Sequence, residues 1–496
     1  MTKKIIPLIL CIALSACSFL NNAPKFTLDN ADKLPWLNTE KALTIDDLKN
    51  KLVVVYFFHF ADETQLETLE ILKTSVNRYP DELLVLGVNI PIFKYEKNAS
   101  TLRNFCLKYG LEFPIVHDEN SKIADANSVF SSPLIFVLDY KNQIIQEFEE
   151  MPSKDDFMAL IRSKIHEYSK KKKLDMQVKS LIFTEKEKLK IERRNENSQI
   201  TSVTQNGETI IQEQSSKKYN LFFPCGVAWN EEMEVLAIAD TANHQIKIVD
   251  KYSKLMDIVG SGAPGKKDGK FRNASFKYPH NLVFDGKNLI VIDKGNDLIR
   301  LINLDNQVVQ TLDARQYKGY NTIANFANGF ILGTQKGLLL KYDRENIKTQ
   351  MDRFSSVTGL LYAKDIQKNK NIKAIFVSDG KSASVYAYGK NQLEKLDWNG
   401  SNLVYPQGLA YSSGNLYVAD TYENKIKIFD LLQNSVKDLE INIENCQGDF
   451  CQSVFEPYAL IKAKYGFEDT IFIADSARHR ILRHTISNNK TEIFFE

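Results

Sequence analysis

The sequence predicts a multidomain protein in which an α/β domain precedes an all-β propeller of six blades. Its 496 residues are too many for a single hydrophobic core. Strand-like and helix-like patterns alternate between residues 52 and 150, which is typical of an α/β sheet. From residue 221 onward, a pattern of short strands and turns recurs six times, which is typical of a propeller.

The composition excludes several classes of protein. Apolar residues make up 43% of the chain and charged residues 25%, so global disorder is not expected. The 64 basic and 62 acidic side chains leave a net charge of only +2, so we expect no nucleic-acid partner. Six cysteines in a chain of this length exclude a small scaffold stapled by disulfides. No pattern in the sequence indicates a cofactor, and none is expected.

The first residues are typical of a secretory signal. Lys3 and Lys4 precede an apolar run at residues 5–14, which is shorter than the roughly 20 residues that cross a membrane as a helix. The next residues, Leu14-Ser-Ala-Cys17, resemble the lipobox of bacterial lipoproteins. The resemblance implies that residues 1–16 are removed and that Cys17 carries the lipid. The alternative is a plain signal peptide with a cysteine nearby.

The same resemblance predicts where the protein resides. Residues 17–35 would form a lipidated, polar tether. Each buried methylene of the acyl chains contributes about 0.8 kcal/mol to membrane binding, so the anchor would be strong. Ser18, rather than Asp, follows the cysteine, which in Gram-negative lipoproteins goes with the outer membrane. We therefore expect a lipid-anchored protein of the bacterial cell envelope, facing the periplasm.

Residues 36–160 are predicted to form the α/β domain. Leu52–Phe58 is a continuous apolar run, as expected for a strand buried on both faces. Residues 63–79 and 101–109 have helical spacing, and Gly110 is placed to end the second helix. Further strands are predicted at residues 83–90, 134–138 and 144–148.

This order of elements resembles the thioredoxin fold. Ser132-Pro133 stands where that family has a cis-proline, which makes Pro133 a candidate for the cis form. The string Trp36-Leu-Asn-Thr-Glu-Lys41 resembles one subgroup, the thioredoxin-like proteins that continue into NHL repeats. The resemblance implies a thioredoxin-like domain over residues 36–160.

The redox cysteines of that subgroup are missing. Alignment on the first buried strand places the Cys-x-x-Cys positions at Asp62-Glu63-Thr64-Gln65, and no cysteine lies between Cys17 and Cys106. Thiol–disulfide exchange needs a thiolate and a resolving thiol, which Asp62 and Gln65 do not provide. We therefore expect no oxidoreductase activity at this position. Cys106, in a predicted helix, is expected to be a buried free thiol.

Residues 161–220 are predicted to form a charged helical connector. The segment is dense in Lys, Glu and Arg, and mixed signs of charge are typical of a solvated helix. The run of four lysines at residues 170–173 could instead contact anionic headgroups.

Residues 221–496 contain the six repeats. In the four clearest copies a proline opens the repeat and an aspartate ends its second strand, as with Pro406 and Asp420. Two weaker copies centre on residues 329–334 and 375–379. Each repeat fits a four-stranded antiparallel blade, and closure into a ring hides the edges of the sheets. The pattern Asp-[Thr/Ser]-x-Asn resembles NHL repeats, which implies a six-bladed NHL propeller.

The repeated polar residues are expected to be structural. An aspartate at a strand end can accept hydrogen bonds from turn amides. This prediction covers Asp240, Asp293, Asp379, Asp420 and Asp475, with Asn243, Asn296 and Asn424 in the same turns. His244 and His479, which also lie in these turns, are expected to be structural as well.

The residues that follow the blade-opening prolines are expected to line the central channel. They are Cys225, His280, Gln407 and Tyr458. One enzyme that resembles the chain here, the peptidylglycine amide lyase, holds zinc with histidines at this position. Only His280 matches, and catalytic zinc needs three protein ligands, so no metal is expected. Cys225 and His280 could form a nucleophile–base pair on adjacent blades, or they could line the channel without chemistry.

A second cysteine pair lies before the last blade. Cys446 and Cys451 flank Gln-Gly-Asp-Phe, and the glycine allows the turn that a disulfide between them would need. An oxidising periplasm would favour this candidate disulfide, and two free thiols are the alternative.

These observations favour a binding or scaffold protein over an enzyme. We expect a protein or glycan ligand on the propeller face, and no residue is predicted to be catalytic. The alternatives are an enzyme with an unrecognised site in the propeller channel and a structural component of an envelope assembly.

Overall fold

The computed structural model describes residues 24–60, 65–190, 203–205, 208–210, 221–312, 318–327, 329–343, 346–363, 373–397, 402–443 and 452–496. The signal peptide at residues 1–16 and the candidate site residues Cys17, Asp62, Cys446 and Cys451 lie outside these ranges. Contacts divide the chain into two compact units. Unit 1 comprises residues up to 59, 67–92 and 112–188, and unit 2 comprises residues 60–66, 93–111 and 189–496.

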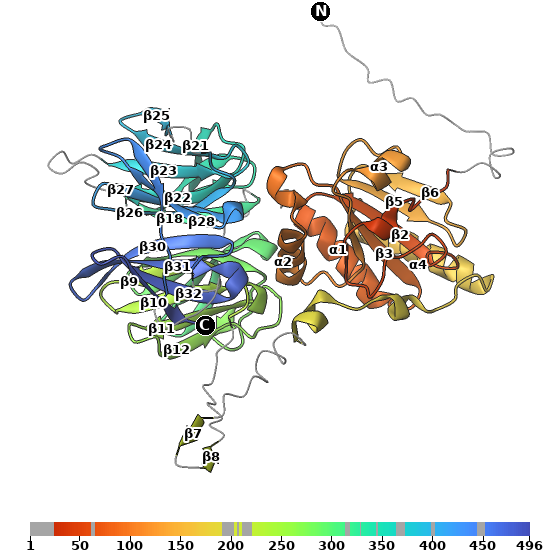
Figure 1. Ribbon diagram of the computed structural model, residues 1–496, viewed down its shortest axis with the longest axis horizontal. Helices are drawn as coiled ribbons and strands as arrows, with labels where there is room; N and C mark the ends of the chain where they lie inside the picture. Colours follow the sequence, from red (N-terminus) through yellow and green to blue (C-terminus); the bar gives the residue numbers. More distant parts are fainter. Residues whose placement is uncertain are drawn as a thin grey trace, which may run out of the picture. The chain divides into compact units, whose positions relative to one another are not determined.

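Unit 1 is built on a six-stranded mixed sheet with the order β1-β4-β3-β2-β5-β6 (Figure 1). Strands β2, β3 and β4 run parallel, whereas β5 and the two edge strands are antiparallel to their neighbours. The strands are β1 (Trp36–Leu37), β2 (Leu52–Phe58), β3 (Leu83–Asn89), β4 (Ile115–His117), β5 (Leu134–Leu138) and β6 (Ile144–Phe148). Strands β1 and β4 were not predicted, because two or three residues are too few to show a period.

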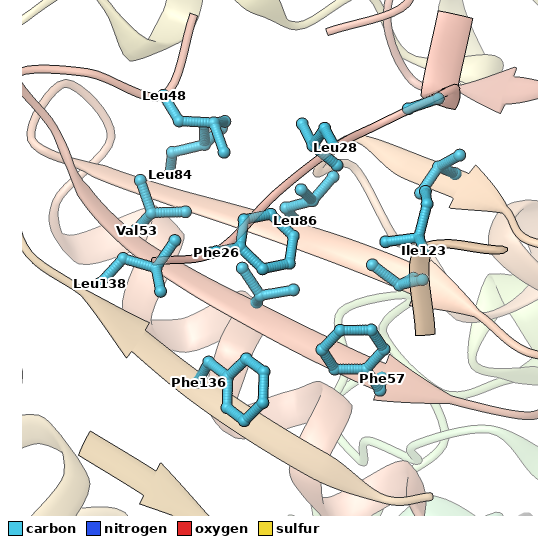
Figure 2. Packing of buried hydrophobic residues seen from close by; sticks show 14 of the residues in the cluster. Phe26, Leu28, Leu48, Val53, Phe57, Leu84, Leu86, Ile123, Phe136 and Leu138 are labelled. Atoms are coloured by element: carbon cyan, nitrogen blue, oxygen red, sulfur yellow. The ribbon is translucent and has the colours of Figure 1, made fainter. Parts of the chain in front are cut away.

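The central strands carry the core of unit 1. All seven residues of β2 are buried, as the continuous apolar run predicted. Figure 2 shows the side chains of one face, with Val53 and Phe57 of β2 between Leu84 of β3 and Phe136 of β5. The rings of Phe57 and Phe136 meet edge to face, with centroids 5.4 Å apart.

Part of the predicted tether belongs to this core. Phe26 and Leu28 lie within the segment at 17–35 that was predicted to be a polar tether, yet they are only 2% and 7% exposed. Both pack into the same cluster as Phe57 (Figure 2). The two apolar side chains are excluded from water when they pack there, so a tether, if present, ends before residue 26.

Helix α4 (Lys154–Lys170) crosses the predicted domain boundary at residue 160. Ser153 caps it by accepting a hydrogen bond from the Asp156 backbone N–H. Phe157, Ile161 and Ile165 are buried, and their spacing places them on one face of the helix. Residues 161–170 are therefore part of unit 1 and not a solvated connector. The other helices of the sheet are α1 (Leu66–Arg78) and α3 (Lys122–Ala126).

The propeller consists of six antiparallel sheets whose first strands surround the centre of a ring (Figure 1). This confirms the predicted fold class. Blade 1 has β9 (Pro224–Asn230), β10 (Val235–Asp240), β11 (Gln245–Asp250) and β12 (Leu255–Val259). Blade 2 has β14 (Pro279–Asp285), β15 (Asn288–Asp293), β16 (Leu298–Asn303) and β17 (Val308–Leu312), with the short β13 (Gly269–Lys270) at its edge.

The remaining blades follow the same order. Blade 3 has β18 (Tyr320–Phe326), β19 (Gly329–Thr334), β20 (Leu338–Tyr342) and β21 (Ile347–Asp352), and blade 4 has β22 (Val357–Ala363), β23 (Ala374–Asp379), β24 (Ser384–Gly389) and β25 (Gln392–Lys395). Blade 5 has β26 (Pro406–Ser412), β27 (Asn415–Asp420), β28 (Lys425–Asp430) and β29 (Ser435–Asp438), and blade 6 has β30 (Pro457–Tyr465), β31 (Glu468–Asp475), β32 (Arg480–Thr485) and β33 (Lys490–Phe495).

Blades 3 and 4 correspond to the two weak repeats. Thr334 of blade 3 pairs with the first residue of its blade, as Asp293 does in blade 2. Its hydroxyl accepts a hydrogen bond from the Leu338 backbone N–H. The polar group at the strand end is thus kept while the aspartate that defines the repeat is replaced.

The ring closes between blades 6 and 1. All four strands of blade 6 come from the C-terminal residues 457–495, so no strand is exchanged between the first and last blades. The two blades share one apolar cluster, in which Val227 and Ile238 of blade 1 pack with Phe472 and Ile481 of blade 6. Closure therefore depends on side-chain packing and on the hydrogen bonds described below.

Helix α2 (Ala99–Tyr109) falls in unit 2. Asn98 caps its first turn by accepting a hydrogen bond from the Ser100 backbone N–H. Gly110 ends it with φ 58°, in the left-handed region, which confirms the predicted stop. Within the described residues, no helix has the length and apolar character that crossing a membrane requires.

Candidate ligand site in the propeller

In blades 1, 2, 4, 5 and 6 the second strand ends in an aspartate. Its carboxylate accepts hydrogen bonds from backbone N–H groups that lie just before the first strand of the same blade. The Phe222 N–H donates to Asp240 at 2.7 Å, and the Lys277 N–H donates to Asp293 at 2.7 Å. The same bond is made to Asp379 by Ser355 and Ser356, to Asp420 by Val404 and Tyr405, and to Asp475 by Phe455. The geometry gives these aspartates a structural role.

The asparagines of the turns divide into two positions. Asn243 and Asn296 donate their side-chain amides to Asp240 and Asp293, each at 2.8 Å. Asn424 stands one residue later in its turn, has φ 59° and accepts a hydrogen bond from the Glu456 N–H. In that blade Glu423 occupies the position equivalent to Asn243 and Asn296. The sequence analysis grouped Asn424 with these two asparagines and did not distinguish the two positions.

In blades 1, 2, 5 and 6 the residue at the position of Asn424 links the blade to the next one. His244, Asp297, Asn424 and His479 all have φ between 52° and 59° and accept a backbone N–H from the residues before the following blade. His479 Nδ1 accepts from Phe223 at 3.1 Å and so joins blade 6 to blade 1. These histidines are structural acceptors, which requires that Nδ1 carry no proton.

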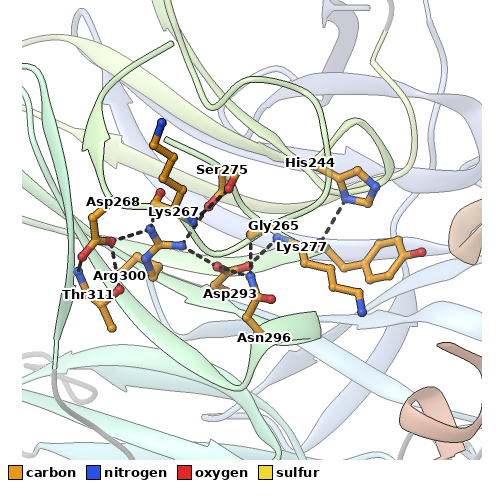
Figure 3. Close-up of polar contacts among 11 residues, drawn as sticks. His244, Gly265, Lys267, Asp268, Ser275, Lys277, Asp293, Asn296, Arg300 and Thr311 are labelled. Carbon is orange, nitrogen blue, oxygen red and sulfur yellow. Dashed lines mark hydrogen bonds and ion pairs between the residues drawn. The ribbon is translucent and has the colours of Figure 1, made fainter. Parts of the chain in front are cut away.

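Blade 2 holds a polar network centred on the buried Arg300 (Figure 3). Arg300 is fully buried and donates to Asp293 at 2.8 Å and to Asp268 at 2.7 Å. It also donates to the backbone carbonyls of Ser275 and Lys267, and Asp268 in turn accepts from Thr311. Burial raises the pKa of Asp293 to about 6, against the opposing effects of its hydrogen bonds and of Arg300. The network fixes the loop before β14 onto the blade.

Six equivalent residues form a ring one position after the start of each first strand. They are Cys225, His280, Asn321, Thr358, Gln407 and Tyr458, and each is at most 5% exposed. The imidazole of His280 meets the ring of Tyr458 edge to face, with centroids 5.3 Å apart. Blades 2 and 6 are separated by blade 1, so these side chains meet over the centre of the ring. The structure therefore brings the predicted channel residues together, and this set is called the channel ring below.

Asn321 and Thr358 were missed by the sequence analysis. Their blades open with Tyr320 and Val357 instead of proline, so the marker that located the other ring positions is absent. The spacing to the strand-ending residues, Thr334 and Asp379, could have located them.

Three ring members are engaged in joining blades. The Asn321 amide donates to the Val357 carbonyl at 2.9 Å, and the Thr358 hydroxyl donates to the Pro406 carbonyl at 2.6 Å. The Cys225 thiol donates to the Phe223 carbonyl at 3.4 Å and lies 3.7 Å from the Ser476 hydroxyl. Neither nitrogen of His280 has a hydrogen-bond partner among the described residues, so Cys225 and His280 do not form a nucleophile–base pair here.

His280 and Gln407 stand apart from the other ring members. Neither nitrogen of His280 nor Nε2 of Gln407 makes a hydrogen bond of good geometry in the described part of the chain. Burial holds the pKa of His280 well below its usual value, the charges of Lys294 and Lys108 lower it further, and the Asn321 backbone opposes this shift. The ring therefore presents a neutral imidazole and a carboxamide.

Lys294 brings positive charge to this ring. It is buried and directly follows Asp293, the residue that ends the second strand of blade 2. Its ammonium group donates to the amide oxygen of Asn321 at 2.8 Å. In blades 1 and 5 the same position is Thr241 and Thr421, whose hydroxyls donate to the carbonyls of Pro279 and Pro457. Lys294 therefore also joins its blade to the next one, and unlike the threonines it adds a positive charge.

Segment 93–111 of unit 2 supplies further groups near the ring. Lys108 Nζ lies 3.9 Å from the centroid of Tyr458, a cation–π contact. Asn104 donates to the buried Glu456 carboxyl at 3.0 Å, and Tyr95 stacks on Tyr422 with centroids 4.5 Å apart. Burial raises the pKa of Glu456 to about 7, opposed by the Asn104 hydrogen bond and the Lys108 charge.

The predicted redox position of unit 1 is described only in part. Gln65 is buried, and the Ser132–Pro133 peptide bond is cis. Cys106 and Cys225 are both buried and form no disulfide among the described residues. Within the ranges that the structure covers, no group of three or more His, Cys, Asp or Glu side chains is arranged to hold a metal.

Family comparisons agree with these two architectures. Residues 20–147 match the AhpC/TSA family, and residues 403–429 match the NHL repeat. The chain combines an AhpC/TSA thioredoxin-like domain with NHL repeats. The matched NHL segment contains β27 and the Asp420 turn, which the sequence pattern had selected.

Homologues of the chain include proteins named NHL repeat-containing protein 2. The chicken protein is 24% identical over 537 residues, covering 90% of this chain and 68% of its own length. The human protein is 24% identical over 441 residues, covering 82% of this chain and 54% of its own length. The chain thus spans about half to two thirds of these relatives.

Among solved structures, a streptogramin B lyase is similar at 14% identity and a TM-score of 0.36. The match covers 56% of this chain and 84% of the lyase. At this level of similarity the comparison carries no inference about activity.

Proposed function

We propose that this protein is a membrane-anchored periplasmic lipoprotein that acts as a binding or scaffold protein. The observation that carries the binding role is the pairing of a thioredoxin-like domain with an NHL propeller. Support for the anchor comes from the sequence, where Leu14-Ser-Ala-Cys17 follows a short apolar run. Its partner would be a protein or glycan bound on the propeller face, and the thioredoxin-like domain would serve as a second interaction surface.

We propose no redox role for the thioredoxin-like domain, because of the residues that occupy its Cys-x-x-Cys positions. Asp62 and Gln65 provide neither an attacking thiolate nor a resolving thiol. An insulin-reduction assay on the purified protein is expected to show no turnover above background. Turnover comparable to that of a thioredoxin would contradict this part of the proposal.

Crosslinking in the intact envelope, followed by identification of the captured molecules, tests the binding role. A protein or glycan enriched over a strain without the chain supports it. Detergent phase partitioning tests the anchor, because Cys17→Ala should move the protein from the detergent phase to the aqueous phase. Cys106→Ala is the matched control and should remain in the detergent phase. If Cys17→Ala also remains there, the proposed anchor is wrong.

A further inference from the structure

The channel ring contains more buried polar groups than the joining of blades requires. Asn321 and Thr358 donate to carbonyls of the following blades, and Cys225 lies 3.7 Å from the Ser476 hydroxyl of blade 6, so the burial of these three residues has a structural explanation. His280 and Gln407 occupy equivalent positions in blades 2 and 5 and are each 3% exposed. Their three nitrogens make no hydrogen bond of good geometry among the described residues, although the Asn321 backbone acts on the imidazole of His280 and raises its pKa. Buried polar atoms are usually hydrogen-bonded, so this set requires an explanation.

The two side chains lie in blades that face each other across the ring. Six blades in sequence order place blade 2 opposite blade 5. The contact between His280 and Tyr458 shows that ring side chains reach the centre. A molecule at this centre would contact the imidazole of His280 and the amide of Gln407, and the almost complete burial of both side chains restricts it to a small size.

The charge around His280 is positive. Lys294 and Lys108 both contribute to the lowered pKa of this histidine, and the Asn321 backbone opposes them; Lys108 also acts on the buried Glu456, whose pKa burial raises to about 7. Asp293, next to Lys294 in the chain, is engaged by Arg300 at 2.8 Å. A neutral imidazole can donate one hydrogen bond, and a carboxamide nitrogen can donate two. Donors within a positive field match the oxygens of a carboxylate.

We propose that the channel ring binds a small carboxylate-bearing molecule through the N–H groups of His280 and Gln407, with Lys294 supplying the compensating charge. This inference goes beyond the proposed function, because it concerns a small ligand within the propeller and does not depend on a partner at its surface. The ring residues are almost completely buried, so exchange of the ligand requires transient opening.

Thermal unfolding of the full-length protein with added carboxylates tests the site. Acetate, malonate and succinate would be compared with sodium chloride at equal ionic strength, and inorganic phosphate would serve as a second anion. A carboxylate that binds the native state should raise the unfolding temperature by several degrees at saturating concentration. Mass spectrometry of small molecules released on denaturation would detect a ligand retained through purification.

His280→Phe and Gln407→Leu should abolish the temperature rise while leaving the free protein as stable or more stable, because each removes an unpartnered polar group. Thr358→Val is the matched control from the same ring. It should destabilise the free protein by breaking the bond to Pro406 yet keep the response to carboxylate. Lys294→Gln should weaken the response tenfold or more in ligand concentration.

Three outcomes would overturn the proposal. One is a response that persists in both His280→Phe and Gln407→Leu. Another is a response equal to that of sodium chloride. The third is the absence of any response together with no released carboxylate, which would leave ordered water as the occupant of the ring.

Discussion

Blades 2 and 5 share nearly the same sequence motif, but their buried aspartates differ in their ion-pair partners. In blade 2, Asp293 is paired with Arg300, seven residues later, at 2.8 Å. In blade 5, the residue seven positions after Asp420 is Lys427, but its ammonium lies near Asp438 and Glu423. Asp420 has no ion pair within the described residues. The comparison teaches that the repeat specifies the position of the aspartate and not its counter-ion.

The side chain three residues after each aspartate adds to the difference between blades 2 and 5. Asn296 donates to Asp293 in blade 2, whereas Glu423 occupies that position in blade 5. Burial raises the pKa of Asp420, and its backbone hydrogen bonds oppose this while the Glu423 carboxyl adds to it. Burial thus raises the pKa of both aspartates, and only in blade 2 do a cation and an asparagine amide oppose that rise.

The largest expected effect is in the blade 2 network. Arg300→Met would leave Asp293 and Asp268 without their shared cation, which should cost about 3–5 kcal/mol of propeller stability. Lys427→Met is the matched substitution in blade 5 and should cost about 1 kcal/mol or less, because its partners are partly exposed. Calorimetric unfolding of both variants measures the difference. Equal costs would show that the two blades do not differ in this way.

The next effect is a dependence on pH. The folded state binds a proton at Asp420 more tightly than the unfolded chain, whose carboxyl titrates near pH 4, so stability from this group falls as pH rises from about 4 through the raised pKa. Asp420→Asn keeps an acceptor for the Val404 and Tyr405 N–H groups and removes the charge. The variant should gain on the order of 1–2 kcal/mol relative to the wild type between pH 5 and pH 8. Parallel stability curves would exclude this account.

A loss of stability of similar size is expected when a hydrogen bond that links two blades is removed. Asn424→Gly removes the acceptor for the Glu456 N–H while keeping a residue suited to positive φ, and should cost about 1 kcal/mol. Asn424→His should be nearly neutral, because His244 and His479 make the equivalent bond. Asp297→Gly tests the same link in blade 2. Urea unfolding would measure all three, and a loss in Asn424→His as large as in Asn424→Gly would contradict the shared role.

The smallest effect converts blade 5 toward blade 2. Glu423→Asn should let the new amide donate to Asp420, as Asn296 donates to Asp293. We expect a gain of about 0.5 kcal/mol at pH 8, limited by the loss of contacts to Lys425 and Lys427 at 3.5 and 3.6 Å. A thermal shift downward at pH 8 would show that those lysine contacts outweigh the removal of the second carboxyl.

The sequence by itself determined the fold class and the repeat. Six strand–turn units predicted six blades, and the run Leu52–Phe58 predicted a fully buried strand, because local patterns of apolar residues decide which face of an element is buried. The replacement of the redox cysteines by Asp62 and Gln65 is likewise a property of the sequence alone. The first-strand positions Cys225, His280, Gln407 and Tyr458 were also found this way.

Only the tertiary structure decided how these residues meet. The packing of Phe26 and of Ile161 into unit 1 was not visible locally, because each segment is polar on average and its apolar side chains are few. The split between ring members that join blades and those without partners depends on strands far apart in the chain, such as those of Thr358 and Pro406. The counter-ion of a buried carboxylate also comes from another strand. A shift of a few ångströms in the position of that strand is enough to pair its charge with a different carboxylate. For that reason Asp293 and Asp420 look alike in the sequence and differ in the folded protein.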